Sequence, residues 1–139
     1  MLNFFNSILT SSLNSAGFSP YTDFEQVDTI EAKGKCLGFY SIKDVKYSDR
    51  IYSLNNSEYG MEVSGHIEVK LLGKRDDYKT FNEIDNRSFL FISSLVMSDK
   101  IVISNLSRSK IEADANLRRL KSVITFDFKI LVTQSVNGG

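Results

Sequence analysis

The residue types best able to do chemistry are scarce in this chain, which has one histidine and one cysteine among its 139 residues. His66 lies on the polar side of an alternating segment, Met61–Leu71, beside Ser64 and Glu68 at same-face spacing. A general base needs a positioned partner and a substrate pocket, and a Cys36/His66 nucleophile pair would also need an oxyanion hole and an orienting acid. The sequence marks neither, so we expect both residues to be dispensable for chemistry and the protein not to be an enzyme.

Metal and cofactor sites are not indicated either. One histidine and one cysteine do not make a typical zinc site. The acidic pair Asp76-Asp77 precedes a predicted helix and is better explained by capping than by cation binding. Glu112 and Asp114 lie in a polar stretch with basic neighbours, and the glycines match no phosphate-binding loop. We therefore expect no metal and no cofactor.

The charge balance limits the classes of partner. The chain has 17 basic and 17 acidic residues and a formal net charge of zero, which argues against a protein that holds DNA or RNA by neutralising phosphates. The basic run Arg118-Arg119-Leu120-Lys121 lacks interleaved aromatic residues, so it favours a solvated patch or a subunit contact. No stretch approaches the ~18 apolar residues of a membrane span. We expect a cytoplasmic protein with no membrane and no specific nucleic-acid partner.

A pair of predicted strands carries most of the tyrosines. The segment Lys35–Tyr47 reads as a strand, Asp49–Ser57 as a polar turn region, and Glu58–Leu72 as a long strand, which together predict an antiparallel hairpin. Tyrosine and arginine near an exposed tip are residue types that interfaces favour, although ordinary cross-strand packing explains the tyrosines equally well. With the basic run, the candidate interface residues are Tyr40, Tyr47, Arg50, Tyr52, Tyr59, Arg118 and Arg119.

The length of the second strand predicts an overhang. The eleven alternating residues of Met61–Leu71, at ~3.4 Å each, span more than the ~13 Å radius of gyration of a domain near this size. We expect the hairpin around residues 40–60 to protrude from a single domain that covers residues 1–139.

Helical spacing and further alternation supply the remaining elements. Helices are predicted over residues 2–16, ending at Gly17, and over 78–96. Strands are predicted over 100–106 and 124–133. Residues 18–31 are interpreted as a loop or weak extended segment, and residues 107–119 as either a strand through Ile111 or a polar connection. The predicted fold is α+β: a mostly antiparallel sheet of about four strands with two helices on one face, in the order α-β-β-α-β-β.

This order of elements resembles the tail-terminator family of tailed bacteriophages and contractile phage-like particles. The resemblance covers nearly the whole chain and rests on a pattern of elements rather than a catalytic signature. Its parts are the helix Leu2–Ala16 with Gly17, the strand Gly38-Phe39-Tyr40-Ser41-Ile42, the strand Glu58–Leu72, the helix Phe81–Leu95, and a closing segment from Ile101–Ser104 through Ala115-Asn116-Leu117-Arg118-Arg119 to Ile124-Thr125-Phe126-Asp127-Phe128. Related tail-completion, head–tail connector and tail-tube-cap proteins share much of this plan.

The resemblance implies a structural role without catalysis. Such proteins form a closed ring, usually sixfold, on the last ring of the tail tube, stop tube growth, and offer a surface to the neck or collar and, in contractile particles, to the sheath end. The protein would then be assembled in the bacterial cytoplasm and become part of a virion or phage-like particle. Fold-level resemblance does not by itself establish function. The alternatives are a small α+β ligand- or peptide-binding domain of another cellular role, and a head–tail connector protein.

Overall fold

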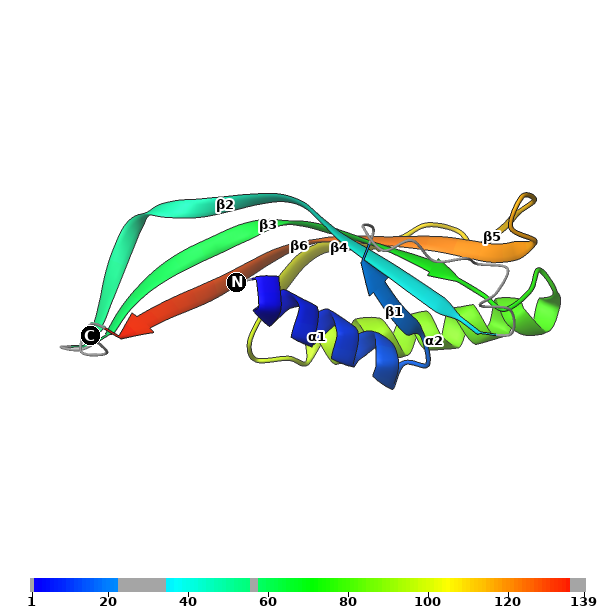
Figure 1. Ribbon diagram of the computed structural model, residues 1–139, viewed down its shortest axis with the longest axis horizontal. Helices are drawn as coiled ribbons and strands as arrows, with labels where there is room; N and C mark the ends of the chain where they lie inside the picture. Colours follow the sequence, from blue (N-terminus) through cyan, green and yellow to red (C-terminus); the bar gives the residue numbers. More distant parts are fainter. Residues whose placement is uncertain (1, 23–34, 56–57, 136–139) are drawn as a thin grey trace.

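The computed structural model describes residues 2–22, 35–55 and 58–135, which form two helices and one six-stranded mixed sheet, an α+β fold (Figure 1). The elements in chain order are α1 (Leu2–Ser15), β1 (Ser19–Thr22), β2 (Leu37–Asn55), β3 (Glu58–Leu72), α2 (Tyr78–Val96), β4 (Val102–Arg108), β5 (Glu112–Asp114) and β6 (Arg119–Ser135).

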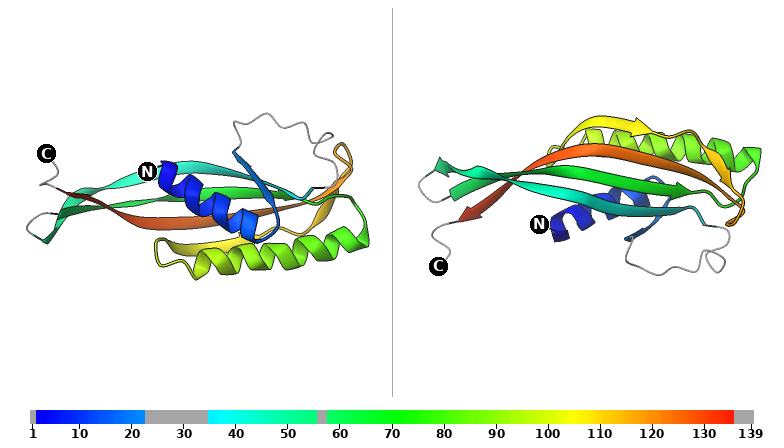
Figure 2. Two further views of the ribbon diagram at one scale, coloured as in Figure 1. Left: turned by 60° about the horizontal axis from the view of Figure 1, so that its bottom comes forward. Right: turned by 90° about the horizontal axis from the view of Figure 1, so that it is seen from above.

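The sheet is built around β3 and β6, which pair antiparallel over the whole of β3. The strand order is β1-β2-β3-β6-β4, with β5 also paired to β6. Only the β1–β2 pair is parallel among the described strands. Both helices lie on one face of the sheet (Figures 1 and 2), and no helix of the described residues covers the opposite face.

Local sequence explains the elements that were predicted closely. In β3 the odd-numbered residues from Val63 to Val69 are buried, while Ser64, His66 and Glu68 are exposed or half-buried, as period-two alternation requires. The α2 helix begins after Asp77, whose carboxylate accepts a hydrogen bond from the Thr80 backbone N–H at 2.8 Å. That hydrogen bond lowers the pKa of Asp77. The predicted capping role of this acid is therefore confirmed, as are the bounds of β3 and α2.

The strand count and order correct the prediction. The described order is α-β-β-β-α-β-β-β, with β1 inside the stretch interpreted as a loop or weak extended segment and β5 inside the polar stretch 107–119. The region 49–55, predicted as a turn, is strand. The predicted tip residues 56 and 57, and residues 23–31 of the predicted loop, lie outside the described residues. Both added strands are short, three and four residues, which leaves little periodicity to detect.

The core lies between the helices and one end of the sheet. Leu9 and Leu13 of α1 and Phe91 and Leu95 of α2 are fully buried against the sheet residues that face them. The sheet contributes Val63, Ile67, Val69, Leu71, Ile124, Phe126, Phe128 and Ile130 to the same cluster. The burial of the same face on both central strands fixes their register, because a one-residue slip would turn every apolar side chain outward.

Three strands continue beyond the helices and curve away together (Figures 1 and 2). We call this part the arm and define it as residues 47–55 of β2, 58–62 of β3 and 131–135 of β6. The hairpin alone was predicted to protrude, whereas in the structure β6 runs beside it to Ser135. The arm is therefore a three-stranded sheet.

A close approach of two strands marks the root of the arm. The pairing of β2 with β3 shifts between Ile42 and Asp44, which leaves Lys43 as an extra residue. Next to this bulge Gly65 pairs with Val45, and an added Cβ at Gly65 would collide with the Asp44 carbonyl oxygen. Only glycine permits this approach, and bulges bend and twist the strand that carries them.

Candidate interaction surface

Tyr40, predicted as an interface residue, is part of the core. Its side chain is only 6% exposed, and its hydroxyl donates to Asn6 Oδ1 at 3.2 Å. The Tyr40 hydroxyl thus links β2 to α1 within one chain. Cross-strand and helix packing, the other interpretation of the tyrosines, applies here.

Arg119 is also buried rather than presented at the surface. It is 3% exposed, and its Nη1 donates to the backbone carbonyls of Lys35 at 2.8 Å and Gly73 at 2.9 Å. Burial lowers the pKa of its guanidinium. Arg119 therefore fastens the start of β6 to the chain next to β2 and β3, while its neighbour Arg118 is exposed at a φ of 53°.

The remaining predicted interface residues belong to the arm. Tyr47 is 56% exposed and pairs with Val63, so its side chain lies on the face that the helices cover elsewhere. Arg50 and Tyr52 lie in β2 and Tyr59 lies in β3, but their side chains fall outside what the structure describes. The arm thus brings one described tyrosine and three further candidates together along one hairpin.

His66 is the centre of a polar ladder across four strands. Its Nδ1 lies 2.5 Å from Asp44 Oδ1 on β2, and its Nε2 lies 2.9 Å from Asp127 Oδ1 on β6. Asn105 of β4 donates through Nδ2 to Asp127 Oδ2 at 2.6 Å. We call Asp44, His66, Asp127 and Asn105 the His66 ladder; it crosses the solvent-facing side of the sheet at the root of the arm.

The ladder favours the charged form of His66. The hydrogen bond to Asp44 raises the pKa of His66, with a further contribution from the Asp127 charge, and the same hydrogen bond lowers the pKa of Asp44. Both ring nitrogens donate only when the imidazole is protonated. With a carboxylate at each ring nitrogen, His66 is arranged to form ion pairs with the neighbouring strands. A general base needs one ring nitrogen to accept a proton from the substrate, and here both nitrogens contact carboxylates.

Cys36 and His66 do not meet. Leu37, next to Cys36, pairs with Leu72, whereas His66 pairs with Asp44 farther along β2. The Cys36 thiol is buried and lies 4.0 Å from Glu83 Oε2. The described residues include no group of three histidine, cysteine or acidic side chains arranged to hold a metal ion. The register therefore keeps Cys36 and His66 apart, so they do not form the nucleophile pair, which the sequence also does not favour.

Both outer edges of the arm lack a neighbouring strand in the described part of the chain. On one side, β1 pairs with β2 only as far as Tyr40. On the other side, β4 pairs with β6 only as far as Lys129. Beyond these positions β2 runs to Asn55 and β6 to Ser135, and an open strand edge presents backbone donors and acceptors to any strand that approaches.

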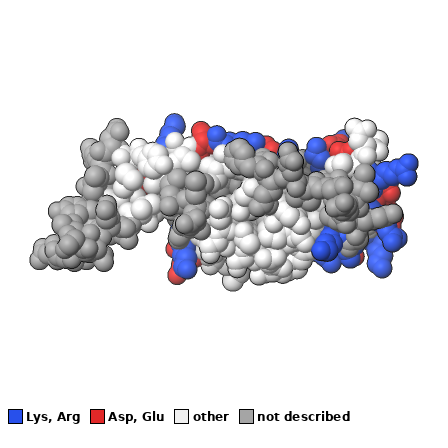
Figure 3. Space-filling view, in the orientation of Figure 1, with Lys and Arg blue, Asp and Glu red and all other residues white. Residues whose placement is uncertain are grey.

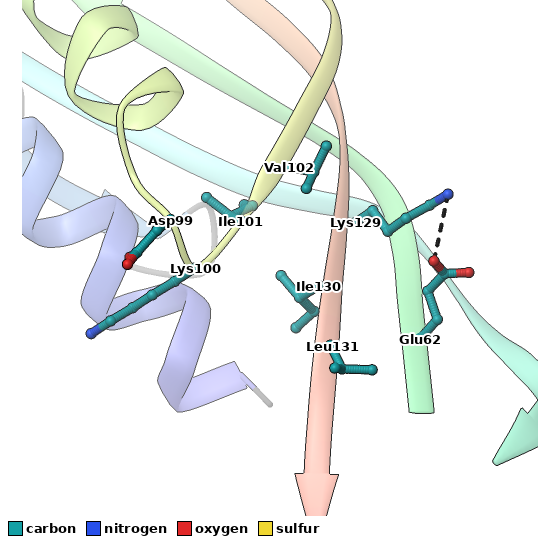
Figure 4. Close-up of a pocket in the computed structure, with 8 residues that line it drawn as sticks. All are labelled: Glu62, Asp99, Lys100, Ile101, Val102, Lys129, Ile130 and Leu131. Carbon is teal, nitrogen blue, oxygen red and sulfur yellow. Dashed lines mark ion pairs between the residues drawn. The ribbon is translucent and has the colours of Figure 1, made fainter. Parts of the chain in front are cut away.

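A hollow of about 390 Å³ opens at the point where β4 stops and the free edge of β6 begins (Figure 4). Val102 and Leu131 beside it are exposed by 66% and 53%. At its far side Lys129 Nζ and Glu62 Oε1 form an ion pair at 3.6 Å. Its lining residues are Glu62, Asp99, Lys100, Ile101, Val102, Lys129, Ile130 and Leu131. The hollow thus combines an unpaired backbone edge with exposed apolar side chains.

Charged and apolar side chains occupy different parts of the surface. In Figure 3, Lys, Arg, Asp and Glu gather along the sheet and at the end away from the arm, and a broad uncharged area lies over α1. The α2 helix also exposes large apolar side chains, among them Tyr78, Phe89, Leu90 and Val96, and Met97 directly after the helix is exposed as well. Exposed apolar groups of this kind are common at contact surfaces between proteins.

Neither helix in the described part of the chain has the length and hydropathy that a membrane crossing requires. Set against known proteins, the chain matches no family model, and no curated protein is significantly similar to it.

Proposed function

We propose that the protein is a structural, ring-forming component of a phage tail or a contractile phage-like particle, which caps the tail tube and joins it to the neck or collar. The observation that supports this proposal most directly is the three-stranded arm, which projects beyond the helices with two open edges. The resemblance to the tail-terminator family drawn from the sequence also supports it, through the helices α1 and α2 and the long strand β3 that the structure retains.

The mechanism of such a protein is geometric. An interface that joins two different patches of the same subunit generates a closed ring when the rotation between neighbours closes, and an open filament when it does not. The two open edges of the arm, one along β2 and one along β6, provide two such different patches. A net charge of zero keeps the self-repulsion between subunits small. One face of the ring would then match the tube, and the other would bind the neck or collar and, in contractile particles, the sheath.

The test is assembly of the purified protein and of the particle. We expect size-exclusion chromatography with light scattering to give a multiple of the 15.7 kDa subunit mass, and a cryo-electron map to show a rotationally symmetric ring at the end of the tail tube. A wild-type protein that stays monomeric, together with a map that shows a single copy in the particle, would overturn the proposal.

A matched variant removes the arm hairpin alone. Because Tyr47 pairs directly with Val63, replacing residues 48–62 by Asn-Gly joins these two positions through a two-residue hairpin turn. This variant should fold and fail to form rings, whereas Lys79→Ala, at an exposed position near the start of α2 and outside the arm, should fold and assemble. A hairpin-less variant that still produces tails of normal length would contradict a role for the arm.

The alternative function, a small ligand- or peptide-binding domain, is favoured by the hollow beside β6. An extended peptide can add a strand to an open sheet edge and place its side chains in adjoining pockets. Tail tube and sheath genes beside the coding sequence would favour the particle, and also its head–tail connector variant. Tight binding of extended peptides by a strictly monomeric protein would favour the alternative.

A further inference from the structure

We infer that the free edge of β6 in the arm accepts the free edge of β2 from a second copy of this chain, so that the sheet continues in parallel across the subunit boundary. The inference rests on the proposed ring assembly and names the contact that would close the ring.

The hydrogen bonds of β6 show which of its backbone groups face the open edge. The Val123 carbonyl accepts from the Ser109 N–H at 2.8 Å, and the Val123 N–H donates to Ser109 Oγ at 2.8 Å, so Val123 faces the β4 side. The Leu120 carbonyl instead accepts from the Gly73 N–H at 2.9 Å, on the β3 side. Backbone groups alternate along a strand, and the register of β6 with β3 is unbroken from Lys121 to Ser135. Leu131, Thr133 and Ser135 therefore point their N–H and C=O groups outward.

The same reasoning gives the outward groups of β2. The Gly73 N–H faces β6, and the Glu62 N–H faces β2, where it donates to Ser48 Oγ at 3.2 Å. Even-numbered residues of β3 thus face β2, including those paired with Asp44 and Lys46. Because directly opposed residues of an antiparallel pair point toward each other or away together, Val45 and Tyr47 point their backbone groups away from β3, toward the second open edge.

Strand direction makes the two edges compatible. Both β2 and β6 are antiparallel to β3, so they run in the same direction. A neighbour related by rotation about an axis along the strands therefore presents its β2 parallel to β6, which is the unlike-edge contact that closes a ring. A two-fold axis would instead join two β6 edges or two β2 edges in antiparallel fashion.

The hollow shows where an added strand would begin. β4 ends its pairing at Val102, opposite Lys129, and the space beyond it along β6 is the hollow in Figure 4. A strand seated there continues the line of β4, extends the sheet ladder, and covers the exposed side chains of Val102 and Leu131.

Cysteine cross-linking tests the contact directly. In a Cys36→Ser background, Lys46→Cys and Leu131→Cys place thiols on the same, solvent-facing side of the two edges. Within one chain β3 separates these strands, so the two Cα atoms lie at least two strand spacings, ~9.6 Å, apart, beyond the ~7 Å Cα–Cα limit for a disulfide. Oxidation should therefore give a series of covalently linked multimers, of which the closed ring is the largest. The pair Tyr47→Cys and Leu131→Cys, on opposite faces, should give none.

Proline substitution tests the backbone hydrogen bonds. Leu131→Pro removes an outward N–H and leaves the β3–β6 bonds intact, a position that tolerates proline; Leu131→Val keeps the N–H. We expect association of the proline variant to weaken about tenfold, equivalent to ~1.4 kcal/mol, with circular dichroism unchanged and Leu131→Val like wild type. Should Leu131→Pro fold poorly, Thr133→Pro removes the next outward donor.

The outcomes separate this contact from the ring itself. If the proline variants still form rings and the cysteine pair gives no series of cross-linked multimers, the edge pairing is wrong and the proposed function stands. A series of cross-linked multimers with no upper size would support the edge pairing and overturn the closed ring. Dimers formed by Leu131→Cys alone would indicate two-fold β6–β6 pairing and overturn the inference. A wild-type protein that shows no association at any concentration or on the particle would overturn both.

Discussion

The same three strands run through two different halves of the molecule. In the covered half, β2, β3 and β6 lie under α1 and α2, and side chains such as Ile67 and Phe126 are almost completely buried. In the arm no described element covers them, and Tyr47 and Leu131 are more than half exposed. Burial of apolar area is the main favourable term in folding, so stability resides in the covered half, whereas the arm is held by backbone pairing and is available to partners.

The largest expected effect is the loss of a core aromatic ring in the covered half. Phe91→Ala removes a fully buried side chain of α2 and should lower the free energy of unfolding by ~3–5 kcal/mol. Phe89→Ala, two residues away on the same helix, removes a ring that is 68% exposed and should cost less than ~0.5 kcal/mol. Urea unfolding followed by circular dichroism measures both, and equal losses would contradict the assignment of the core.

Arg119 provides a second test at the covered end. Arg119→Ala leaves the Lys35 and Gly73 carbonyls without their guanidinium donor and should cost ~2–3 kcal/mol, as for other buried hydrogen bonds to a charged group. Arg118→Asn, one residue earlier, is exposed at a positive φ that asparagine tolerates, so its effect should be small. If Arg118→Asn were the more damaging change, Arg119 would not be the anchor of β6.

Gly65 tests the boundary between the two halves. Gly65→Ala places a Cβ against the Asp44 carbonyl and 2.9 Å from the Phe128 ring, which forces the strands apart and should cost ~1–3 kcal/mol. Ser64→Ala, at the adjacent position on the opposite face, should be nearly neutral. Thermal unfolding compares the two variants; a neutral Gly65→Ala would mean that the root of the arm is not closely packed.

The smallest effect is the pH dependence of the His66 ladder. The pKa of His66 is raised from its ordinary value of 6.5, so its stabilising contribution is complete below pH 6.5 and is lost as the pH rises through the raised folded-state pKa. The pKa of Asp44 is lowered from 3.8, so its contribution is present above pH 3.8 and is lost as the pH falls through the lower folded-state pKa. Melting temperatures of wild type and His66→Asn should therefore converge above the folded-state pKa of His66. If the two melting temperatures differed by the same amount at every pH, the ion pairs of the His66 ladder would not contribute to stability.

The halves also differ in how far the sequence predicts them. Alternation of apolar and polar residues predicts the bounds of β3 correctly, and helical spacing predicts those of α2. In the arm, β2 runs through Asp49–Asn55, a stretch whose polar residues indicate a turn. An uncovered sheet has no buried face to impose alternation, so the pattern that identifies a strand fades where the helices end.

The candidate site was predictable in part for the same reason. Tyr47 could be placed on an exposed hairpin from residue type and position alone. The His66 ladder could not, because the bulge at Lys43 decides whether Asp44 lies opposite His66, and alternation does not locate bulges. The burial of Tyr40 and Arg119 depends on Asn6, Lys35 and Gly73, which are distant in sequence and give no local signal.

The position of β6 in the sheet has a consequence for how the chain folds. β6 follows every other described strand in sequence, yet it lies between β3 and β4 and pairs with β3 over all of that strand's length. Until β6 has been synthesised, the β2–β3 hairpin keeps one long edge open, and the two helices lack the buried β6 side chains, such as Ile124, Phe126 and Phe128, against which they pack. Because such non-local pairings are slow to form and bare edges recruit other strands, the nascent chain passes through a stage in which it is prone to aggregate, and it gains its cooperative fold only when the last strand inserts.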